Sequence, residues 1–336
     1  MNRHRAVTAG HLCGDDRAAR HGAGGTRRHH RMDIGFIGLG VMGAPMATHL
    51  AKAGHRLTLL DANAAVARDL AATIGGSAVT DPAAVAAASE VVVTMLPNGE
   101  IVQQVALGDD GLIHGLREGA IVLDTSSAEP WLTQRTAQAL AARGATMVDA
   151  PVSGAAWGAQ AAELVFMVGG SDADVTRVRP LLDRMGRAVH HLGRLGAGHA
   201  MKCLNNCITA MTFVATAEAL VAGKRYGLDP AVMVDVLNQS TGGSWITQTH
   251  FHQRIFNRSF DDPFKLELMR KDVGIAVQLA QQTATPMPMA GLGQQLWLMA
   301  EHAAGPGASI SELVRWVEQL CGTELTPGRG DPQGRV

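Results

Sequence analysis

The stretch Asp33-Ile-Gly-Phe-Ile-Gly-Leu-Gly-Val-Met-Gly43 decides the fold of this 336-residue chain. Residues 33–38 form a short apolar run that ends in glycine, which predicts a buried strand leading into a tight turn. Residues 41–53 then have helical spacing of apolar residues and stop at Gly54. A strand, a glycine-rich turn and a helix in this order predict the first unit of a parallel sheet.

The glycines of the turn have the spacing G-x-G-x-x-G, which suits a backbone that holds a pyrophosphate. Gly38 permits the tight turn, Gly40 lets the backbone approach the phosphates, and Gly43 lets the helix pack closely on the strand. The helix N-terminus adds free N–H groups and a positive partial charge. A generic turn is the alternative, and the strand and helix on either side argue against it. We assign to cofactor binding Gly38, Leu39, Gly40, Val41, Met42 and Gly43.

An acidic residue follows at the position where a dinucleotide needs one. Asp61 ends the next predicted strand, residues 56–61, and lies 18 residues after Gly43. A carboxylate there can accept hydrogen bonds from an adenosine ribose. Ala-Asn-Ala-Ala follows Asp61, with no nearby arginine to receive a 2′-phosphate, and the aspartate charge would repel that group. The sequence therefore favours NAD, with NADP the less favoured cofactor.

Strands and helices alternate through the first part of the chain. Further strands are predicted at residues 91–96, 120–124, 146–149, 164–168 and 189–192. Alanine-rich helical stretches separate them, at residues 64–73, 82–88, 100–107, 130–142 and 172–185. This alternation predicts an α/β fold, a Rossmann-type doubly wound parallel sheet covered by helices on both faces.

The pattern changes after about residue 195. Residues 198–226 contain no proline and are apolar nearly all round, which predicts a long helix buried between domains or subunits. Helical stretches without any strand signal follow at residues 230–239, 263–283, 288–303 and 309–321. We expect a disordered extension at 1–31, a dinucleotide-binding domain at 32–194, an all-α domain at 195–323 joined by the long helix, and a flexible tail at 324–336.

Composition excludes several classes of protein. With 46% hydrophobic and 18% charged residues the chain can bury a core, and four cysteines are too few for a disulfide scaffold. The longest uncharged run, Val273 to Ala300, holds five glutamines and two prolines, so it is a poor membrane span. Residues 32–336 carry 22 basic and 28 acidic side chains, and this acidic balance argues against a nucleic-acid partner.

Residues 1–31 differ from the rest, with seven arginines against two aspartates. They could be a transit peptide or a basic arm. We favour Met32 as the true start, because a strand begins directly after it. The excess of arginine over lysine in the whole chain is typical of a GC-rich bacterial genome, from which we expect a cytoplasmic protein.

An ordered set of motifs resembles the β-hydroxyacid dehydrogenase family, which includes 3-hydroxyisobutyrate dehydrogenase and tartronate semialdehyde reductase. The resemblance covers about residues 32–322. Its segments are Gly35-Phe-Ile-Gly-Leu-Gly-Val-Met-Gly-Ala-Pro-Met46, Met95-Leu-Pro97, Asp124-Thr-Ser-Ser127, Asp149-Ala-Pro-Val-Ser-Gly154, Gly196-Ala-Gly-His-Ala-Met-Lys-Cys-Leu-Asn-Asn206 and Lys271-Asp272. It implies hydride transfer between a nicotinamide cofactor and a small 3-hydroxy acid, in a homodimer or homotetramer.

The resemblance also implies roles for single residues. Lys202 matches the family's catalytic lysine and Asn206 the asparagine that orients the substrate. Ser153 and Gly154 match the pair that binds the substrate carboxylate, and Ser126 lies in the neighbouring substrate-side loop. Three positions match residues that line the nicotinamide half of the cofactor site: Leu96, Pro97 and Thr125. Lys271 matches a lysine that reaches the cleft from the helical domain and is assigned to cofactor binding.

The sequence departs from the family pattern at three places. His49 stands where asparagine is common, and Ala155 replaces a frequent second glycine after Pro-Val-Ser-Gly. Glu163 adds a charge in the segment after Gly158. None of these changes removes a catalytic group, but they leave the identity of the acid open.

Lysine suits the chemistry if its proton affinity is lowered. Oxidising an alcohol removes a hydride from carbon and a proton from oxygen, and a side chain must accept the proton. Lys202 lies in the first turns of the predicted long helix, where burial and the positive end of the helix dipole both disfavour the ammonium. We therefore expect its pKa to fall. Asn206 is four residues further on and shares the same helix face.

Other interpretations remain. His199, Cys203 and Cys207 form one helical stripe, but three ligands on a straight helix cannot enclose a tetrahedral metal, so we favour core packing. An imine reductase on the same scaffold typically has another residue at the lysine position. A decarboxylating sugar-phosphate dehydrogenase shows Lys-x-x-His-Asn, whereas Cys-Leu-Asn-Asn follows Lys202. A catalytically inactive binding module would lose the lysine.

Overall fold

The computed structural model describes residues 31–330. Most of the predicted N-terminal extension and the last six residues of the predicted tail lie outside this range. The described residues from Met32 onward belong to one compact unit.

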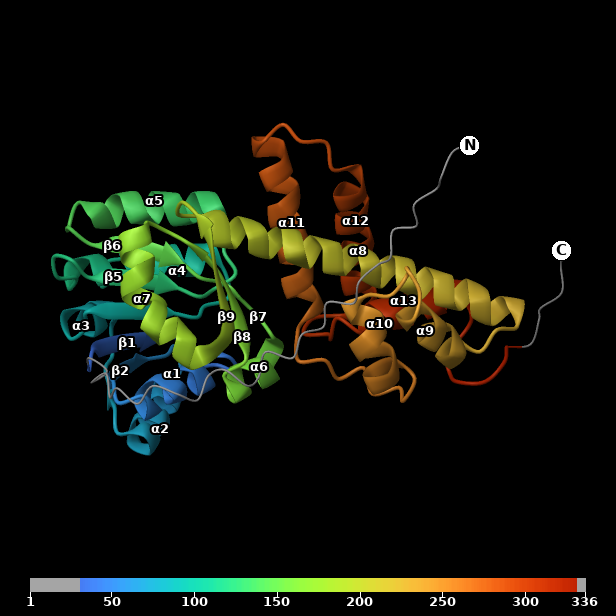
Figure 1. Cartoon of the computed structure of the whole chain (residues 1–336), viewed down its shortest axis with the longest axis horizontal. Helices are drawn as coiled ribbons and strands as arrows, with labels where there is room; N and C mark the ends of the chain where they lie inside the picture. The colour runs from blue at the N-terminus through green and yellow to red at the C-terminus, as the bar shows by residue number, and fades with distance from the viewer. Residues whose placement is uncertain (1–30, 331–336) are drawn as a thin grey trace, which may run out of the picture. The chain divides into compact units, whose positions relative to one another are not determined.

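One nine-stranded sheet forms the core of the first domain (Figure 1). Six strands run parallel, in the order β3-β2-β1-β4-β5-β6. Their bounds are β1 Asp33–Ile37, β2 Arg56–Leu60, β3 Ser77–Ala78, β4 Val91–Thr94, β5 Ile121–Asp124 and β6 Thr146–Asp149. The order reverses direction at β1, as in a doubly wound fold, and the Rossmann-type prediction is confirmed.

Three further strands extend the sheet beyond β6. β8 (Leu164–Gly169) is antiparallel to β6 and to the short β7 (Val152–Ser153), and β9 (Gly186–Gly193) is parallel to β8. The sheet is therefore parallel-dominated rather than wholly parallel. The two-residue strands β3 and β7 were not predicted, because they are too short to show a pattern of alternating apolar residues.

Helices cover both faces of the sheet, and each face has its own apolar core. Strand residues alternate between the two cores: Val91 and Val93 pack with α1 (Gly43–Lys52) and α7 (Asp172–Met185), whereas Val92 packs with α3 (Pro82–Ala87), α4 (Gly99–Leu107) and α5 (Pro130–Ala141). The remaining helices are α2 (Ala64–Ile74), α6 (Ala155–Ala161) and a short 3-10 turn at Leu112–His114. Burial on both faces explains why these strands are continuous apolar runs.

Side-chain caps set where several of these helices begin. Asn63, Asp81 and Asn98 each accept a hydrogen bond from a backbone N–H in the first turn of α2, α3 and α4. Asn98 directly follows Pro97, so its cap also fixes the loop after β4.

α8 (Ala197–Tyr226) joins the two domains (Figure 1). Its 30 residues make a helix about 45 Å long. It begins at the sheet domain and continues through the helical domain, where α11 (Leu266–Gln282), α12 (Pro288–Ala304) and α13 (Glu312–Cys321) pack against it. Among the helices of residues 31–330, α8 alone is long and apolar enough to span a membrane. Its packing in the helical core covers part of this apolar stretch, of which 44% is buried within the chain.

The helical domain has a core built around aromatic side chains. Trp297 and Phe213 are fully or almost fully buried there, and their rings lie 6.1 Å apart. α9 (Pro230–Asn238) confirms a predicted helix. α10 (Trp245–His250) and the π-helical turn Phe251–Ile255 were missed, because they are short and follow the glycine-rich segment at 241–243.

The segment predicted as a flexible tail begins at residue 324. Its first residues contact the helical domain: Leu325 is fully buried, and Lys224 Nζ donates to the carbonyl oxygens of Thr326 and Gly328.

Candidate active site

Each of the three glycines of the G-x-G-x-x-G loop suits its position for a different physical reason. Gly38 has φ +92°, and a Cβ there would lie 2.3 Å from the Met95 carbonyl oxygen. A Cβ at Gly43 would lie 1.9 Å from the Gly38 carbonyl oxygen, so α1 can pack this closely only on glycine. A Cβ at Gly40 would meet nothing within 4 Å. The open space at Gly40 fits a pyrophosphate that approaches the backbone at the helix start.

Asp61 lies beside this loop, directly after β2. Its carboxylate accepts hydrogen bonds from the backbone N–H of Leu39 at 2.7 Å and of Asn63 at 2.9 Å. Leu39 contributes this backbone contact while its side chain is buried, whereas the side chain of Val41 is 66% exposed. The acid, the loop and the helix N-terminus therefore occupy the places that a dinucleotide requires.

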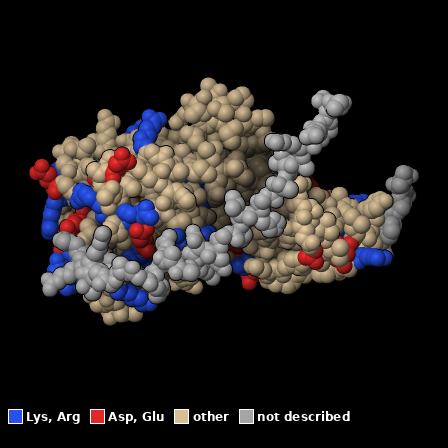
Figure 2. All heavy atoms as spheres, viewed as in Figure 1, with Lys and Arg blue, Asp and Glu red and all other residues tan. Residues whose placement is uncertain are grey.

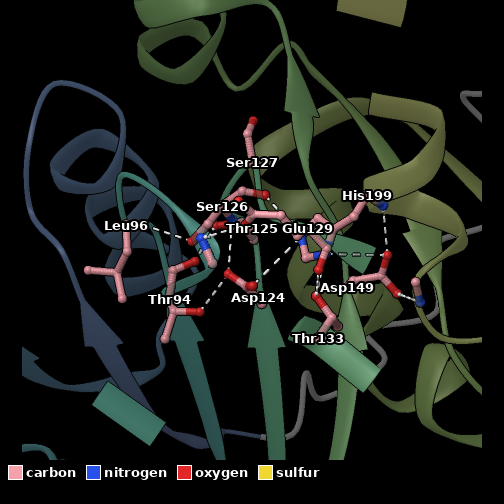
Figure 3. Close-up of polar contacts among 12 residues, drawn as sticks. Thr94, Leu96, Asp124, Thr125, Ser126, Ser127, Glu129, Thr133, Asp149 and His199 are labelled. Carbon is pink, nitrogen blue, oxygen red and sulfur yellow. Dashed lines mark hydrogen bonds and ion pairs between the residues drawn. The ribbon is translucent and has the colours of Figure 1, made fainter. Parts of the chain in front are cut away.

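The loops after β4 and β5 are tied to each other at the carboxyl edge of the sheet (Figure 3). The backbone N–H of Leu96 donates to Ser126 Oγ at 2.9 Å, and Thr125 Oγ1 donates to the Thr94 carbonyl oxygen at 2.7 Å. Ser126 is fully buried, so this hydroxyl faces the neighbouring loop in the structure. Its assigned contact with substrate stays a prediction. Ser127 is partly exposed, and Figure 3 shows its side chain pointing away from these contacts.

Lys202 and Asn206 lie on one face of α8, as their spacing predicts. Lys202 Nζ donates to Asn206 Oδ1 at 3.2 Å. Asn206 Nδ2 in turn donates to Asp272 Oδ2 on α11 at 2.6 Å, and both of these side chains are buried. The carboxylate therefore fixes which way the Asn206 amide points and leaves its oxygen toward the lysine.

Lys271 connects the helical domain to the sheet domain. From α11 its ammonium donates to the carbonyl oxygens of Pro97, at 3.1 Å, and of Ser127. It also forms an ion pair with its neighbour Asp272 at 3.3 Å. Lys271 thus holds the loops after β4 and β5 next to the residues that contact Lys202. Asp272 was not assigned a role from the sequence, although the Lys271-Asp272 pair was visible there.

The pKa of Lys202 is lowered from the ordinary lysine value. Burial is the largest cause, because the ammonium loses hydration. The Asp272 carboxylate acts in the opposite direction, and the positive charge of Lys271 lowers the pKa further. The direction agrees with the sequence-based expectation, and it favours a neutral amine that can accept a proton.

The two cysteines near Lys202 pack in an apolar cluster with Ile275, Ala276 and Ala290. Burial raises the pKa of Cys203 to about 12, with the Asp272 carboxylate and Cys207 adding to the rise, and burial raises the pKa of Cys207 as well. Neither thiol is poised to react as a thiolate near neutral pH. In residues 31–330 no group of three or more His, Cys, Asp or Glu side chains is arranged to hold a metal. His199, from the same stripe, lies in a polar network instead.

Ser153 and Gly154 lie on and directly after β7, which pairs with β8. Both are half-buried, and Gly154 has φ +134°. Ala155 follows with φ +51°, a left-handed conformation that costs an alanine about 1–2 kcal/mol relative to the right-handed one. A glycine at position 155, which is frequent in the family pattern, would adopt this backbone conformation without strain.

The other two departures from the family pattern also have a place in the structure. His49 on α1 contacts the carbonyl oxygens of Ala159 and Gln160, both at 3.0 Å, and so ties α1 to α6. Glu163 is exposed at the start of β8.

Comparison with known proteins agrees with this geometry. Residues 33–193 match a family model described as the NAD binding domain of 6-phosphogluconate dehydrogenase. Residues 196–317 match one described as NAD-binding of NADP-dependent 3-hydroxyisobutyrate dehydrogenase.

Relatives match over nearly their whole length. The chain is 37% identical to a Pseudomonas aeruginosa 3-hydroxyisobutyrate dehydrogenase, over 84% of this chain and 98% of the relative. It is 35% identical to a Eubacterium barkeri 2-(hydroxymethyl)glutarate dehydrogenase, over 88% and 98%. The solved structure of Mycobacterium tuberculosis 3-hydroxyisobutyrate dehydrogenase with L-serine has a TM-score of 0.79 and 31% identity, over 85% of this chain and 99% of that one.

A Rossmann-type domain with a phosphate loop, a long joining helix that carries a lysine, and an all-α domain define a nicotinamide-dinucleotide-dependent dehydrogenase. The chain belongs to the β-hydroxyacid dehydrogenase family, which confirms the resemblance drawn from its sequence.

Proposed function

We propose that this chain oxidises a small 3-hydroxy acid with NAD, and that Lys202 is the general base for the hydroxyl proton. The observation that carries the proposal is the Lys202 amine, with its lowered pKa, bonded to the oriented amide of Asn206. The relatives described above support the substrate class, since 3-hydroxyisobutyrate, 2-(hydroxymethyl)glutarate and L-serine all carry a hydroxyl on the carbon next to Cα.

Each residue of the site has its own role in the proposed oxidation. NAD held at the glycine-rich loop would supply the acceptor for the hydride of the carbinol carbon. Lys202, neutral before the reaction, takes the hydroxyl proton and becomes an ammonium, and it returns that proton in the reverse direction. The amide of Asn206, held by Asp272, orients the hydroxyl. The hydroxyl of Ser153 and the backbone at Gly154 hold the substrate carboxylate without adding a charge.

The competing functions make different use of position 202. An imine reductase on this scaffold typically lacks the lysine, and an inactive module has no need for a lysine whose pKa is lowered. The presence of Lys202 and its contact with Asn206 favour a hydroxy-acid dehydrogenase.

A panel of acids tests the proposal. Purified enzyme would be assayed by the absorbance of reduced nicotinamide with 3-hydroxyisobutyrate, 2-(hydroxymethyl)glutarate, L-serine, glycerate, threonate and sulfonated analogues. We expect NAD-dependent turnover of at least one 3-hydroxy acid. No turnover of any hydroxy acid, together with turnover of a cyclic imine, would replace the proposal with the imine-reductase function.

Cofactor choice is expected to depend on Asp61. Replacing it with Ser removes a charged acceptor for the ribose hydroxyls and the repulsion of a 2′-phosphate, so kcat/KM for NAD should fall by about 10- to 100-fold. The value for NADP should rise. Steady-state kinetics with both cofactors measure the ratio of kcat/KM for NAD to kcat/KM for NADP. An unchanged ratio would show that Asp61 does not contact the adenosine ribose.

We further propose that the chain forms a homodimer or homotetramer through its helical domain. α12 exposes Met289, Leu292 and Met299, each more than half exposed, and the face over α11 and α12 seen in Figure 2 shows few charged side chains. Such a face is typical of a subunit contact. Light scattering coupled to gel filtration should give twice or four times the chain mass, and Leu292→Glu should lower it. A monomeric mass for the wild type would contradict the proposal.

A further inference from the structure

His199 is a buried titratable side chain that the proposed chemistry does not use. It lies in the first turn of α8, three residues before Lys202, and is 1% exposed. Figure 3 shows His199 close to Asp149 and Thr133, beside the carboxyl ends of β5 and β6.

The ring of His199 is surrounded by hydrogen-bond acceptors. Nε2 lies 3.1 Å from the Ser126 carbonyl oxygen and 3.6 Å from Asp124 Oδ2. A carbonyl and a carboxylate only accept, so Nε2 carries a proton. Nδ1 lies 2.8 Å from Thr133 Oγ1 and 3.9 Å from Asp149 Oδ2.

The proton of the Thr133 hydroxyl has another acceptor. Thr133 Oγ1 donates to the Glu129 carbonyl oxygen at 3.2 Å, one turn back along α5. With the hydroxyl proton directed at that carbonyl, the Thr133 lone pairs are free to accept from His199 Nδ1. A neutral imidazole has a single N–H, whereas the acceptors at this site can take one from each ring nitrogen.

The surrounding charges point the same way. Asp124 and Asp149 are fully buried, and both lie within ion-pair distance of the His199 ring. Asp149 is well bonded, because it accepts from the backbone N–H of Gly196 at 2.7 Å and of His199 at 2.8 Å. Asp124 Oδ1 accepts from Thr94 and Ser126, but its Oδ2 has no hydrogen-bond partner. A cation beside this bare oxygen offsets a charge that would otherwise be costly to bury.

The contacts of His199 join three parts of the active site. Its backbone N–H and Asp149 hold the start of α8, its Nε2 holds the loop after β5 at Ser126, and its Nδ1 holds α5 at Thr133. Ser126 Oγ in turn accepts from Leu96 in the loop after β4. The nicotinamide-side loops and the lysine-bearing helix therefore meet at this one side chain.

We propose that His199 is a buried imidazolium, paired with Asp124 and Asp149, and that it is the positioning residue that sets Lys202 against the loops after β4 and β5. Asp124 from β5 and Asp149 from β6 are the titratable groups that face it, and Lys202 is the next titratable group along α8.

Nitrogen NMR of the histidine rings tests the charge directly. In uniformly labelled protein, the His199 signals are those that the wild type shows and His199→Gln lacks. If His199→Gln does not fold, Thr133→Val identifies the same signals, because it changes only the surroundings of Nδ1. We expect directly bonded protons on both nitrogens at neutral pH. A ring with a bare Nδ1 at neutral pH would overturn the imidazolium.

Kinetics test the positioning role, and only this arm rests on the proposed function. His199→Gln should lower kcat about 100-fold while KM for the acid and the NAD dissociation constant change by less than about threefold, because binding residues are untouched and Lys202 is misplaced. Exposed His190→Gln on β9 is the matched control and should behave like the wild type. If His199→Gln yielded less folded enzyme but kept the wild-type kcat per folded active site, His199 would have only a structural role. That result would overturn the claim that it positions Lys202.

A double-mutant cycle separates charge from shape. Under the proposal Asp124→Asn and His199→Gln each leave an unbalanced charge, so their losses in thermal stability should combine to less than the sum. Strictly additive losses in melting temperature would contradict the pairing of these two side chains.

Discussion

Lys202→Met should lower kcat for 3-hydroxy acid oxidation by about 10²- to 10⁴-fold, the usual contribution of a positioned general base. Met matches the lysine stem in length and apolar character but cannot accept a proton. The loop that holds the dinucleotide lies on α1 and is untouched, so the NAD dissociation constant should stay within about threefold. Stopped-flow single turnovers measure the hydride step, and fluorescence titration measures NAD binding.

The same substitution should not destabilise the protein. The folded chain lowers the pKa of Lys202, so between that lowered value and the ordinary value of about 10.4 the unfolded chain binds more protons. Stability therefore rises with pH through this window, and below it the buried ammonium is a net cost. Lys202→Met removes the cost, and its melting temperature near neutral pH should equal or exceed that of the wild type.

Lys52→Met, at an exposed lysine on α1, is the matched control and should leave both kcat and stability unchanged. If Lys202→Met kept more than about a tenth of wild-type kcat, a positioned base would not be the source of the rate.

Two alanine substitutions in the phosphate loop should fail in different ways. Gly43→Ala places a methyl 1.9 Å from the Gly38 carbonyl oxygen, so α1 must shift, and we expect a loss of about 3 kcal/mol or more in the free energy of unfolding. Gly40→Ala meets no atom within 4 Å, so stability should be unchanged. Its methyl would stand where the pyrophosphate approaches, and NAD affinity should fall by about 10-fold or more.

Urea unfolding without cofactor and NAD titration by fluorescence distinguish the two variants. If Gly40→Ala bound NAD as tightly as the wild type, the phosphates would not lie over this glycine. A Gly43→Ala protein as stable as the wild type would mean that α1 can move away from β1 without cost.

The sheet domain could be predicted closely because each long strand is a separate apolar run between helices. The strands Val91–Thr94 and Ile121–Asp124 are buried on both faces, so nearly all their consecutive residues are apolar and the run is visible in the sequence. β7 and α10 could not be predicted. β7 is defined only by its pairing with β8. α10 begins at Trp245 after the N-cap Ser244, and the glycines just before this cap make the segment look like a loop in the sequence.

The active site was predictable where neighbours in sequence are neighbours in space. Lys202 and Asn206 share a helix face by spacing alone. The contact of Asn206 with Asp272, 66 residues away, depends on how α11 packs on α8, and no local pattern encodes it. The same holds for His199, whose position in a helical stripe with Cys203 and Cys207 suggested an apolar core and whose actual partners come from β5, β6 and α5.

The most direct test of the central claim is to titrate the Lys202 amine itself. The chain has five lysines, so carbon NMR at the lysine ε position gives few signals, and the one missing from Lys202→Met identifies Lys202. In the NAD-bound enzyme the account predicts a midpoint for Lys202 clearly below those of the other four. A midpoint at or above the ordinary lysine value of about 10.4 would contradict it, since Lys202 would then remain an ammonium and could not take the hydroxyl proton.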